Sequence, residues 1–138
     1  MSNSFTWPVR VYYEDTDTAG VVYYANYLKF MERARTEWLR SFGFEQDELI
    51  RDEDMIFVVR SVQLEYLRPA MFNESLTVTA RIKHLGKASV VFEQEVFRDP
   101  DQPEVLVKGE IKLACLGHSS MRPRQIPQPI LEAIQSVV

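Results

Sequence analysis

The sequence predicts an α+β protein in which a five-stranded antiparallel sheet wraps round one long central helix. One segment with aromatic residues at helical spacing lies between a short strand-like segment and four longer ones. Those four are joined mainly by tight turns, which argues against the alternating strand and helix order of a parallel sheet. At 138 residues, the chain has the usual size of one domain, so we assign a single domain to residues 1–138.

The first predicted strand covers residues 7–13, where Val9, Val11 and Tyr13 share one face. A loop rich in acids and threonine follows over residues 14–20. We expect a helix that begins between Val22 and Asn26 and ends at Phe42, because apolar residues recur at spacings of three and four and Gly43 supplies a stop. The residues of this stripe are Tyr27, Phe30, Met31, Ala34, Trp38 and Phe42.

The remaining chain is mostly strand. Residues 46–54 suggest a short polar helix or a loop, and residues 55–66 a strand rich in Val, Ile, Phe and Tyr. Residues 74–84 alternate, a turn at 85–88 leads into a strand through Val90, Phe92 and Val96, and a turn at 99–103 precedes a last strand from Val105 to Leu113. The tail from residue 126 suggests a short docked helix. Because an open sheet exposes its edges, we expect a homodimer or homotetramer.

Composition narrows the function classes. With 16 Lys and Arg against 20 Asp and Glu, the net charge of −4 offers no broad basic field for nucleic acid or an anionic membrane. No segment approaches the length of a membrane span, and no basic and apolar leader opens the chain, so we expect a cytoplasmic protein. The single cysteine, Cys115, is assigned to the core, and no residue pattern suggests a metal site.

The most unusual passage is the acidic loop, which holds Glu14, Asp15 and Asp17 within four residues. By composition alone it could be an ordinary solvated loop. The spacing of its acids does not match the ligand pattern of a calcium-binding EF-hand. Its position is more informative, because it ends at Gly20 just before a helix N-terminus. Unpaired N–H groups there can stabilise a developing oxyanion, while a nearby carboxylate attacks a carbonyl or activates water.

The run Tyr-Glu-Asp-Thr-Asp-Thr-Ala-Gly-Val-Val-Tyr-Tyr-Ala-Asn-Tyr, from residue 13 to 27, resembles the signature of the 4-hydroxybenzoyl-CoA thioesterase branch of hotdog-fold proteins. The following Phe-Met-Glu-Arg-Ala-Arg-Thr-Glu is similar to the YbgC group, which is often encoded with the Tol-Pal envelope system. The resemblance implies a hotdog domain that hydrolyses acyl-CoA thioesters, with coenzyme A only as part of the substrate and no other cofactor.

The resemblance also implies roles for individual residues. Asp17 falls on the catalytic carboxylate, as nucleophile or general base, and Tyr24 on the position whose backbone N–H polarises the thioester carbonyl. Tyr13 and the side chain at Tyr24 are implied as further active-site groups. The remaining expected substrate contacts are Gly20, which allows close backbone approach, Tyr23 and Tyr27 in an acyl pocket, and Lys87 with Ser89 for the coenzyme A phosphates. Many YbgC-like sequences carry histidine where this chain has Tyr24.

Two alternatives stay open at this stage. Without that histidine the chain is also compatible with a non-catalytic module that binds acyl-CoA or acyl carrier protein. The sequence does not specify which of these two carries the acyl group. A hotdog dehydratase is disfavoured because His84 and His118 lie far along the chain from the acidic loop. Glu65, between Arg60 and Arg68, is assigned to a structural ion pair and not to catalysis.

Overall fold

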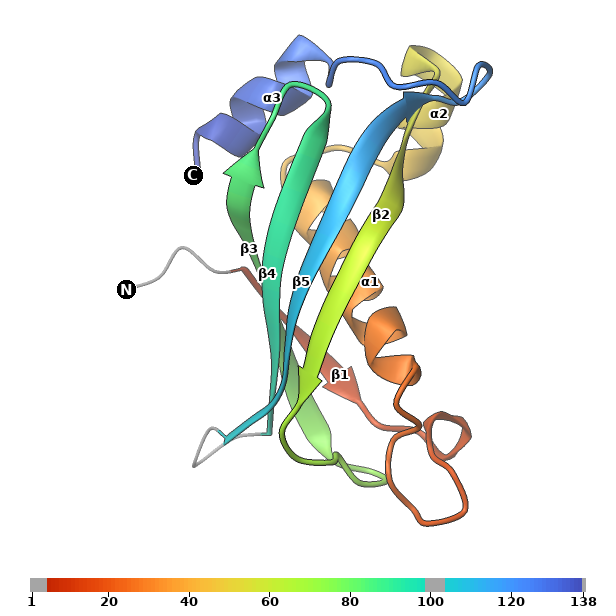
Figure 1. Ribbon diagram of the computed structural model, residues 1–138, viewed down its shortest axis with the longest axis vertical. Helices are drawn as coiled ribbons and strands as arrows, with labels where there is room; N and C mark the ends of the chain where they lie inside the picture. Colours follow the sequence, from red (N-terminus) through yellow and green to blue (C-terminus); the bar gives the residue numbers. More distant parts are fainter. Residues whose placement is uncertain (1–4, 99–103, 138) are drawn as a thin grey trace.

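The computed structural model describes residues 5–98 and 104–137, which form five strands and three α-helices (Figure 1). In chain order these are β1 (Phe5–Arg10), α1 (Asn26–Arg40), α2 (Gln46–Glu53), β2 (Met55–Tyr66), β3 (Ser75–Leu85), β4 (Ser89–Arg98), β5 (Glu104–Gly117) and α3 (Gln128–Gln135). A single 3-10 turn, Tyr13–Asp15, lies between β1 and α1.

All strand pairs are antiparallel, and the sheet order is β1-β3-β4-β5-β2. Helix α1 lies along one face of the curved sheet, while α2 and α3 lie on opposite sides of one end of it (Figure 1). The acidic loop lies at the opposite end, beside the start of α1. The predicted α+β architecture is confirmed, with β1 and β2 as the two edge strands.

The hydrophobic pattern explains this packing. The α1 stripe is buried as predicted, with no exposed surface on Phe30, Met31 or Ala34, whereas Lys29 and Arg33 on the opposite face are exposed. Leu76, Val78 and Ala80 of β3 are also fully buried, and the residues between them are not. The stripe of α1 and the alternate residues of the strands therefore form one core.

Some predicted boundaries are wrong. The first strand ends at Arg10, and Tyr13 does not share the buried face of Val9 and Val11, since 81% of its surface is exposed. Backbone pairing continues as far as the Val11 N–H, which bonds the Glu74 carbonyl, and the chain then leaves the sheet because residues Tyr13–Asp15 turn into a 3-10 helix. Helix α1 ends at Arg40, two residues before Phe42.

Other predictions are settled by the same structure. Gly43 has a φ of +92°, the left-handed conformation that lets glycine follow a helix C-terminus. Residues 46–53 form a helix, and β2 has the predicted bounds. The last strand runs on to Gly117, and the docked tail helix is α3. The predicted turn at 99–103 lies outside the described residues.

Gln94 on β4 is one of two polar side chains, with Asp15, that are buried in the described part of the chain. Its amide nitrogen donates to the carbonyls of Met31 on α1 and Thr79 on β3, both at 3.1 Å. Its amide oxygen accepts from Nη1 of Arg35 at 2.9 Å. One side chain thus ties the middle of α1 to two strands, in a site where unpaired polar groups are costly.

We expect Gln94→Met, which keeps the volume but removes these bonds, to lower the free energy of unfolding by about 1–3 kcal/mol. Urea denaturation measures the change. Gln135→Met at an exposed position of α3 is the matched control and should shift stability by less than about 0.5 kcal/mol. Equal effects of the two substitutions would contradict the role given to Gln94.

Candidate active site

The acidic loop is a tight hairpin closed by backbone hydrogen bonds. The Asp17 N–H donates to the Val21 carbonyl at 2.9 Å, and the Gly20 N–H donates to the Asp17 carbonyl at 3.0 Å. Thr16 and Val22 pair as an isolated antiparallel bridge. Gly20 has a φ of +82°, which favours glycine, so the chain can reverse here within four residues. Hydrogen bonds and a glycine turn within the loop itself therefore define its shape in the residues that precede α1.

The three acids of this loop have different environments. Asp15 is buried, its carboxylate accepts the Tyr12 N–H at 2.8 Å, and its carbonyl accepts the Tyr23 N–H at 2.9 Å. Asp17 is exposed, and its Oδ1 accepts the N–H of Ala19 at 2.9 Å. Glu14 is exposed too. Asp15 thus builds the loop, whereas Asp17 makes no ion pair with any described residue and keeps Oδ2 free for a reactant.

A second loop, residues 67–74, holds the hairpin in place. The Val22 N–H donates to the Ala70 carbonyl at 2.8 Å, and the Phe72 N–H donates to the Gly20 carbonyl at 3.2 Å. The Tyr27 hydroxyl on α1 accepts the Ala70 N–H at 2.9 Å. Helix start, hairpin and second loop therefore form one connected unit.

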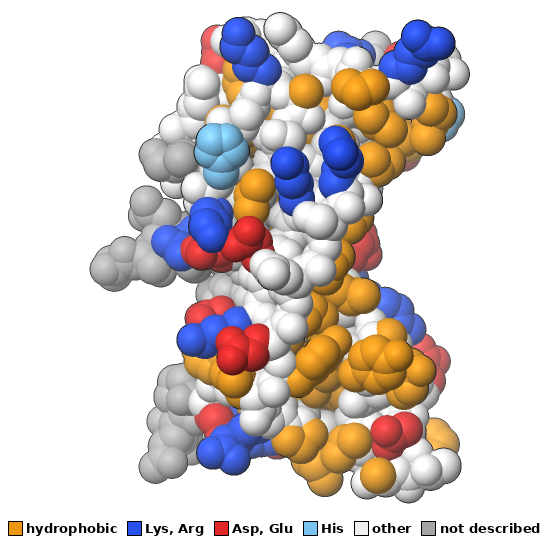
Figure 2. Space-filling view, viewed as in Figure 1, with side chains coloured by type: hydrophobic (Ala, Val, Ile, Leu, Met, Phe, Trp, Pro, Cys, Tyr) orange, Lys and Arg blue, Asp and Glu red, His pale blue; other side chains and the backbone are white. Residues whose placement is uncertain are grey.

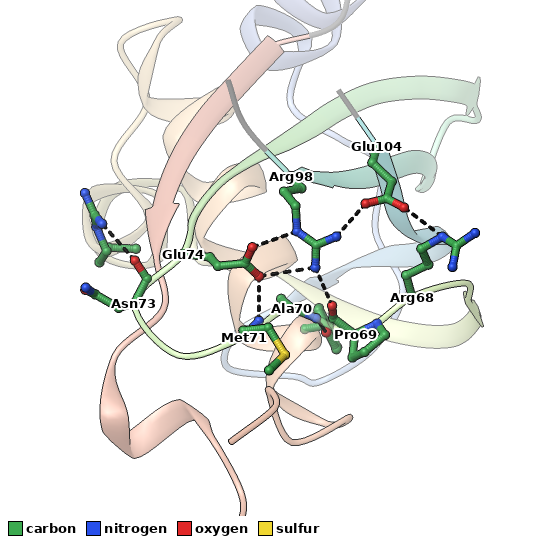
Figure 3. A network of polar contacts seen from close by, with 10 residues as sticks. Arg68, Pro69, Ala70, Met71, Asn73, Glu74, Arg98 and Glu104 are labelled. Atoms are coloured by element: carbon green, nitrogen blue, oxygen red, sulfur yellow. Dashed lines mark hydrogen bonds and ion pairs between the residues drawn. The ribbon is translucent and has the colours of Figure 1, made fainter. Parts of the chain in front are cut away.

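Arg98 at the end of β4 fixes this second loop to the sheet (Figure 3). Its Nε donates to Glu74 Oε2 at 2.7 Å, its Nη2 donates to the Pro69 carbonyl at 2.7 Å, and its Nη1 bonds Glu104. Glu74 in turn accepts the Met71 N–H at 2.6 Å. The acids beside Arg98, Glu74 first, raise its pKa, so the guanidinium stays charged.

The N-terminus of α1 offers unpaired donors beside the hairpin. The N–H groups of Tyr24 and Ala25, which precede the helix, donate to no acceptor among the described residues. Such groups can bind an oxyanion in a water-poor site. The Tyr24 N–H, which was predicted to polarise the thioester carbonyl, is therefore available to a substrate.

Tyrosine rings surround this helix start. The Tyr24 ring meets the Tyr66 ring edge-on at 6.3 Å between centroids, and Tyr27 lies 5.8 Å from Tyr66. The Tyr66 hydroxyl donates to the Tyr24 carbonyl at 3.1 Å. An open cavity of about 260 Å³ adjoins these three rings, with Val22, Leu67, Arg68 and Pro69 completing its lining. Sequence reasoning missed Tyr66, because only its long-range contacts place it here.

Two of the residues that the sequence predicted for this end, Tyr24 and Tyr27, line the cavity. The others, Tyr13, Asp17, Gly20 and Tyr23, do not. Tyr23 is partly exposed, and its ring lies 4.9 Å from that of Tyr24. Tyr13 packs edge-on against Phe72 at 5.9 Å. Tyr27 is almost fully buried, with 2% of its surface exposed, and burial raises the pKa of its hydroxyl. The structure thus gathers Tyr13, Asp17, Gly20, Tyr23, Tyr24 and Tyr27 at one end of the chain.

Lys87 and Ser89 are not brought to this end within one chain. They lie at the turn between β3 and β4, beside α3, whereas β3 begins near the Asp17 loop (Figure 1). The Lys87 side chain is exposed and forms no ion pair with a described residue. His84 near the end of β3 and His118 just after β5 are also at the far end.

Two further assignments have clear outcomes. Cys115 is fully buried, and burial raises the pKa of its thiol, so it is the core residue that the sequence predicted. The prediction of an ion pair for Glu65 is wrong. Arg68 pairs with Glu104 at 2.7 Å, and no described cation forms an ion pair with Glu65. No three His, Cys, Asp or Glu side chains of the described chain are placed to hold a metal ion. Its helices are too short or too polar to span a membrane.

Comparison with known proteins agrees with this geometry. The thioesterase superfamily pattern matches residues 19–105, from the acidic loop to the start of β5. The chain is 39% identical over 133 residues to the acyl-CoA thioesterase YbgC of Haemophilus influenzae, covering 96% of each chain. It is 42% identical over 127 residues to the acyl-CoA thioester hydrolase YbgC of Escherichia coli O6:H1, covering 92% of each.

Solved structures agree as well. The crystal structure of a probable thioesterase from Bartonella henselae superposes with a TM-score of 0.84 at 35% identity, covering 90% of this chain and 99% of the other. Sequence and structure therefore lead to the same family. The chain belongs to the thioesterase superfamily, in its YbgC group, and has the hotdog fold.

Proposed function

We propose that the protein hydrolyses acyl-CoA thioesters to a free acid and coenzyme A. The observation that carries this proposal is that one hydrogen-bonded unit of the chain holds both an Asp17 oxygen and N–H groups at the start of α1 that have no partner among the described residues. The relatives described above bear names of the same activity. The binding-only alternative rests on the absent histidine at position 24, and the relatives named as thioester hydrolases weigh against it.

In the proposed mechanism, the thioester carbonyl accepts the Tyr24 N–H, which stabilises the oxyanion as the carbonyl carbon is attacked. Asp17 either takes a proton from the attacking water, or attacks the carbon itself to form an acyl-aspartate that water then hydrolyses to the free acid and the regenerated Asp17 carboxylate. The thiolate of coenzyme A leaves and takes up a proton. The reaction requires no metal or prosthetic group, and the rings of Tyr24, Tyr27 and Tyr66 border the space for the acyl group.

We further propose that the working unit is a homodimer paired through the free edge of β2. Val59 and Val62 of this strand are 50% and 41% exposed, although their cross-strand neighbours Leu113 and Ile111 are buried. Hydrophobic side chains gather along the β2 side and at the Asp17 end of the molecule (Figure 2). An exposed edge with apolar side chains is the surface that a second copy covers.

Such a dimer would also account for Lys87 and Ser89. Strand β2 begins beside α2 and ends beside the Asp17 loop. Two copies of β2 that pair antiparallel about a twofold axis bring the far end of one protomer toward the Asp17 end of the other. In this arrangement the coenzyme A phosphates meet Lys87 of one protomer while Asp17 of the other acts on the thioester. The use of acyl carrier protein as an alternative acyl carrier and the cytoplasmic location both remain predictions.

The Asp17→Asn variant should lower kcat by about 10²–10⁴, because it removes the base or nucleophile while keeping the size of the side chain. The assay follows free thiol release from short, long and aromatic acyl-CoA substrates. Glu14→Gln, an exposed acid of the same loop, is the matched control and should turn over at nearly the wild-type rate. A folded Asp17→Asn protein with normal kcat would refute the mechanism.

The Tyr24→Phe variant should keep kcat within about tenfold of wild type, because the oxyanion donor is the backbone N–H and the substitution removes one partly exposed hydroxyl. The pH dependence of kcat should stay unchanged as well. A loss of about 10³-fold would instead assign proton transfer to the Tyr24 hydroxyl.

The Val62→Lys variant should weaken the dimer, since it places a charge in the proposed apolar interface. Light scattering after size-exclusion chromatography should give the mass of a dimer for wild type and of a monomer for dilute Val62→Lys. Thr6→Lys on β1 tests the other edge and should remain dimeric. A monomeric wild-type protein with full activity would overturn the proposed assembly.

A further inference from the structure

The side chain of Asn26 joins α1 to the acidic loop. Its Nδ2 donates to the Asp15 carbonyl at 2.9 Å, and this carbonyl also accepts the Tyr23 N–H at 2.9 Å. No other side chain of α1 forms a hydrogen bond with residues 14–22 in the described chain. The contact is partly buried, where a hydrogen bond is stronger than in bulk water. It therefore links the hairpin that carries Asp17 to the start of the helix.

This bond is not an ordinary helix cap. Asparagine near a helix start usually accepts hydrogen bonds from the first N–H groups of its own helix. Here Ala25 is the N-cap residue and makes no side-chain cap bond, while the Asn26 amide donates to a residue eleven positions earlier in the chain. Asparagine is also a poorer helix former than alanine. The contact with Asp15 therefore accounts for an amide at this position.

The backbone of Asn26 acts on a different group. Its N–H donates to the Tyr23 carbonyl at 2.8 Å. The C=O and N–H of a trans peptide point in opposite directions, so this bond turns the Tyr24 N–H, which belongs to the same peptide, away from the helix. A substitution of the Asn26 side chain leaves this backbone bond in place. Such a change therefore acts on the position of the hairpin and not on the direction of the Tyr24 N–H.

A shift of Asp15 is transmitted to Asp17. Thr16, which lies between them, pairs with Val22 as an isolated bridge, and the Asp17 N–H donates to the Val21 carbonyl at 2.9 Å. Because these bonds hold the three residues in one hairpin, the contact that ties the Asp15 carbonyl to α1 also sets the distance from the Asp17 carboxylate to the helix start.

We propose that Asn26 is a positioning residue for Asp17. Its side chain holds the acidic hairpin against the first turn of α1, so that the Asp17 carboxylate and the Tyr24 N–H meet the same thioester carbonyl. A misplacement of about 1 Å between reacting groups can lower a rate by about 10². The inference rests on the proposed hydrolysis and adds to it a residue that touches no reacting atom.

The Asn26→Ala variant should lower kcat by about 10–10² and leave KM within about threefold of wild type, because the groups that bind the substrate stay in place. Lys29→Ala, at an exposed position of the same helical turn, is the matched control and should keep both constants. Asn26→Asp keeps the size of the side chain but replaces the donor with an acceptor, so its kcat should fall at least as far. Circular dichroism and urea denaturation check that each variant is folded in the assay.

A double-mutant cycle separates positioning from a general effect on the fold. Asp17→Asn removes the group that Asn26 positions, so adding Asn26→Ala to it should lower kcat by no more than about threefold further. A general loss of structure would instead multiply the losses of the two single variants. Multiplied losses would therefore overturn the positioning role.

The outcomes also separate this inference from the proposed function. If Asp17→Asn turns over normally, the hydrolysis mechanism fails and the positioning role fails with it. If Asp17→Asn loses activity while both folded Asn26 variants keep a normal kcat, hydrolysis through Asp17 stands and only the positioning role is overturned. A raised KM with normal kcat in Asn26→Ala would assign the side chain to substrate binding and would also overturn it.

Discussion

The position of the acidic loop depends on one guanidinium. Arg98 lies at the end of β4 and binds Glu74, Glu104 and the Pro69 carbonyl, so it fixes residues 67–74 to the sheet. With 28% of its side chain exposed, it is screened less than a surface cation, and a network of such contacts is stronger than an isolated exposed pair. The second loop thereby has a defined position, and so does the acidic hairpin that is hydrogen-bonded to it. Neither segment has regular secondary structure.

That constraint also gives the two aspartates of the acidic loop different environments. The hairpin meets the second loop through Val22 and Gly20, and in this orientation Asp15 points inward and Asp17 outward. A buried carboxylate that already accepts the Tyr12 N–H has a structural use, and moving it would leave that donor unpaired. An exposed carboxylate that caps only its own turn retains an oxygen for chemistry. Under the proposed mechanism, Asp15 therefore serves the folding of the acidic loop and Asp17 serves the reaction.

Sequence periodicity predicted the elements but only part of the site. The bounds of β2 and the buried stripe of α1 follow from side chains that alternate between core and solvent, a property each segment carries by itself. Tyr13 was placed on the wrong face because the chain turns into a 3-10 helix at Tyr13–Asp15, closed by the Asp15 carboxylate on the Tyr12 N–H, and the alternation of side chains does not encode that turn. Tyr66 and Arg98 were missed because no local pattern encodes their contacts. Asp17 itself was singled out by family resemblance, and not by composition.

The distribution of charge gives the proposed assembly a chemical reason. Coenzyme A carries several phosphates, whereas this chain has a net charge of −4. Arg68, the one cation that lines the cavity beside Tyr24 in the described chain, is already paired with Glu104. Lys87 is exposed and makes no ion pair with a described residue, but it lies at the other end of the sheet. On this argument a lone protomer holds the groups that break the thioester bond, while the second protomer supplies the charge that retains the carrier, so loss of the dimer should raise KM more than it lowers kcat.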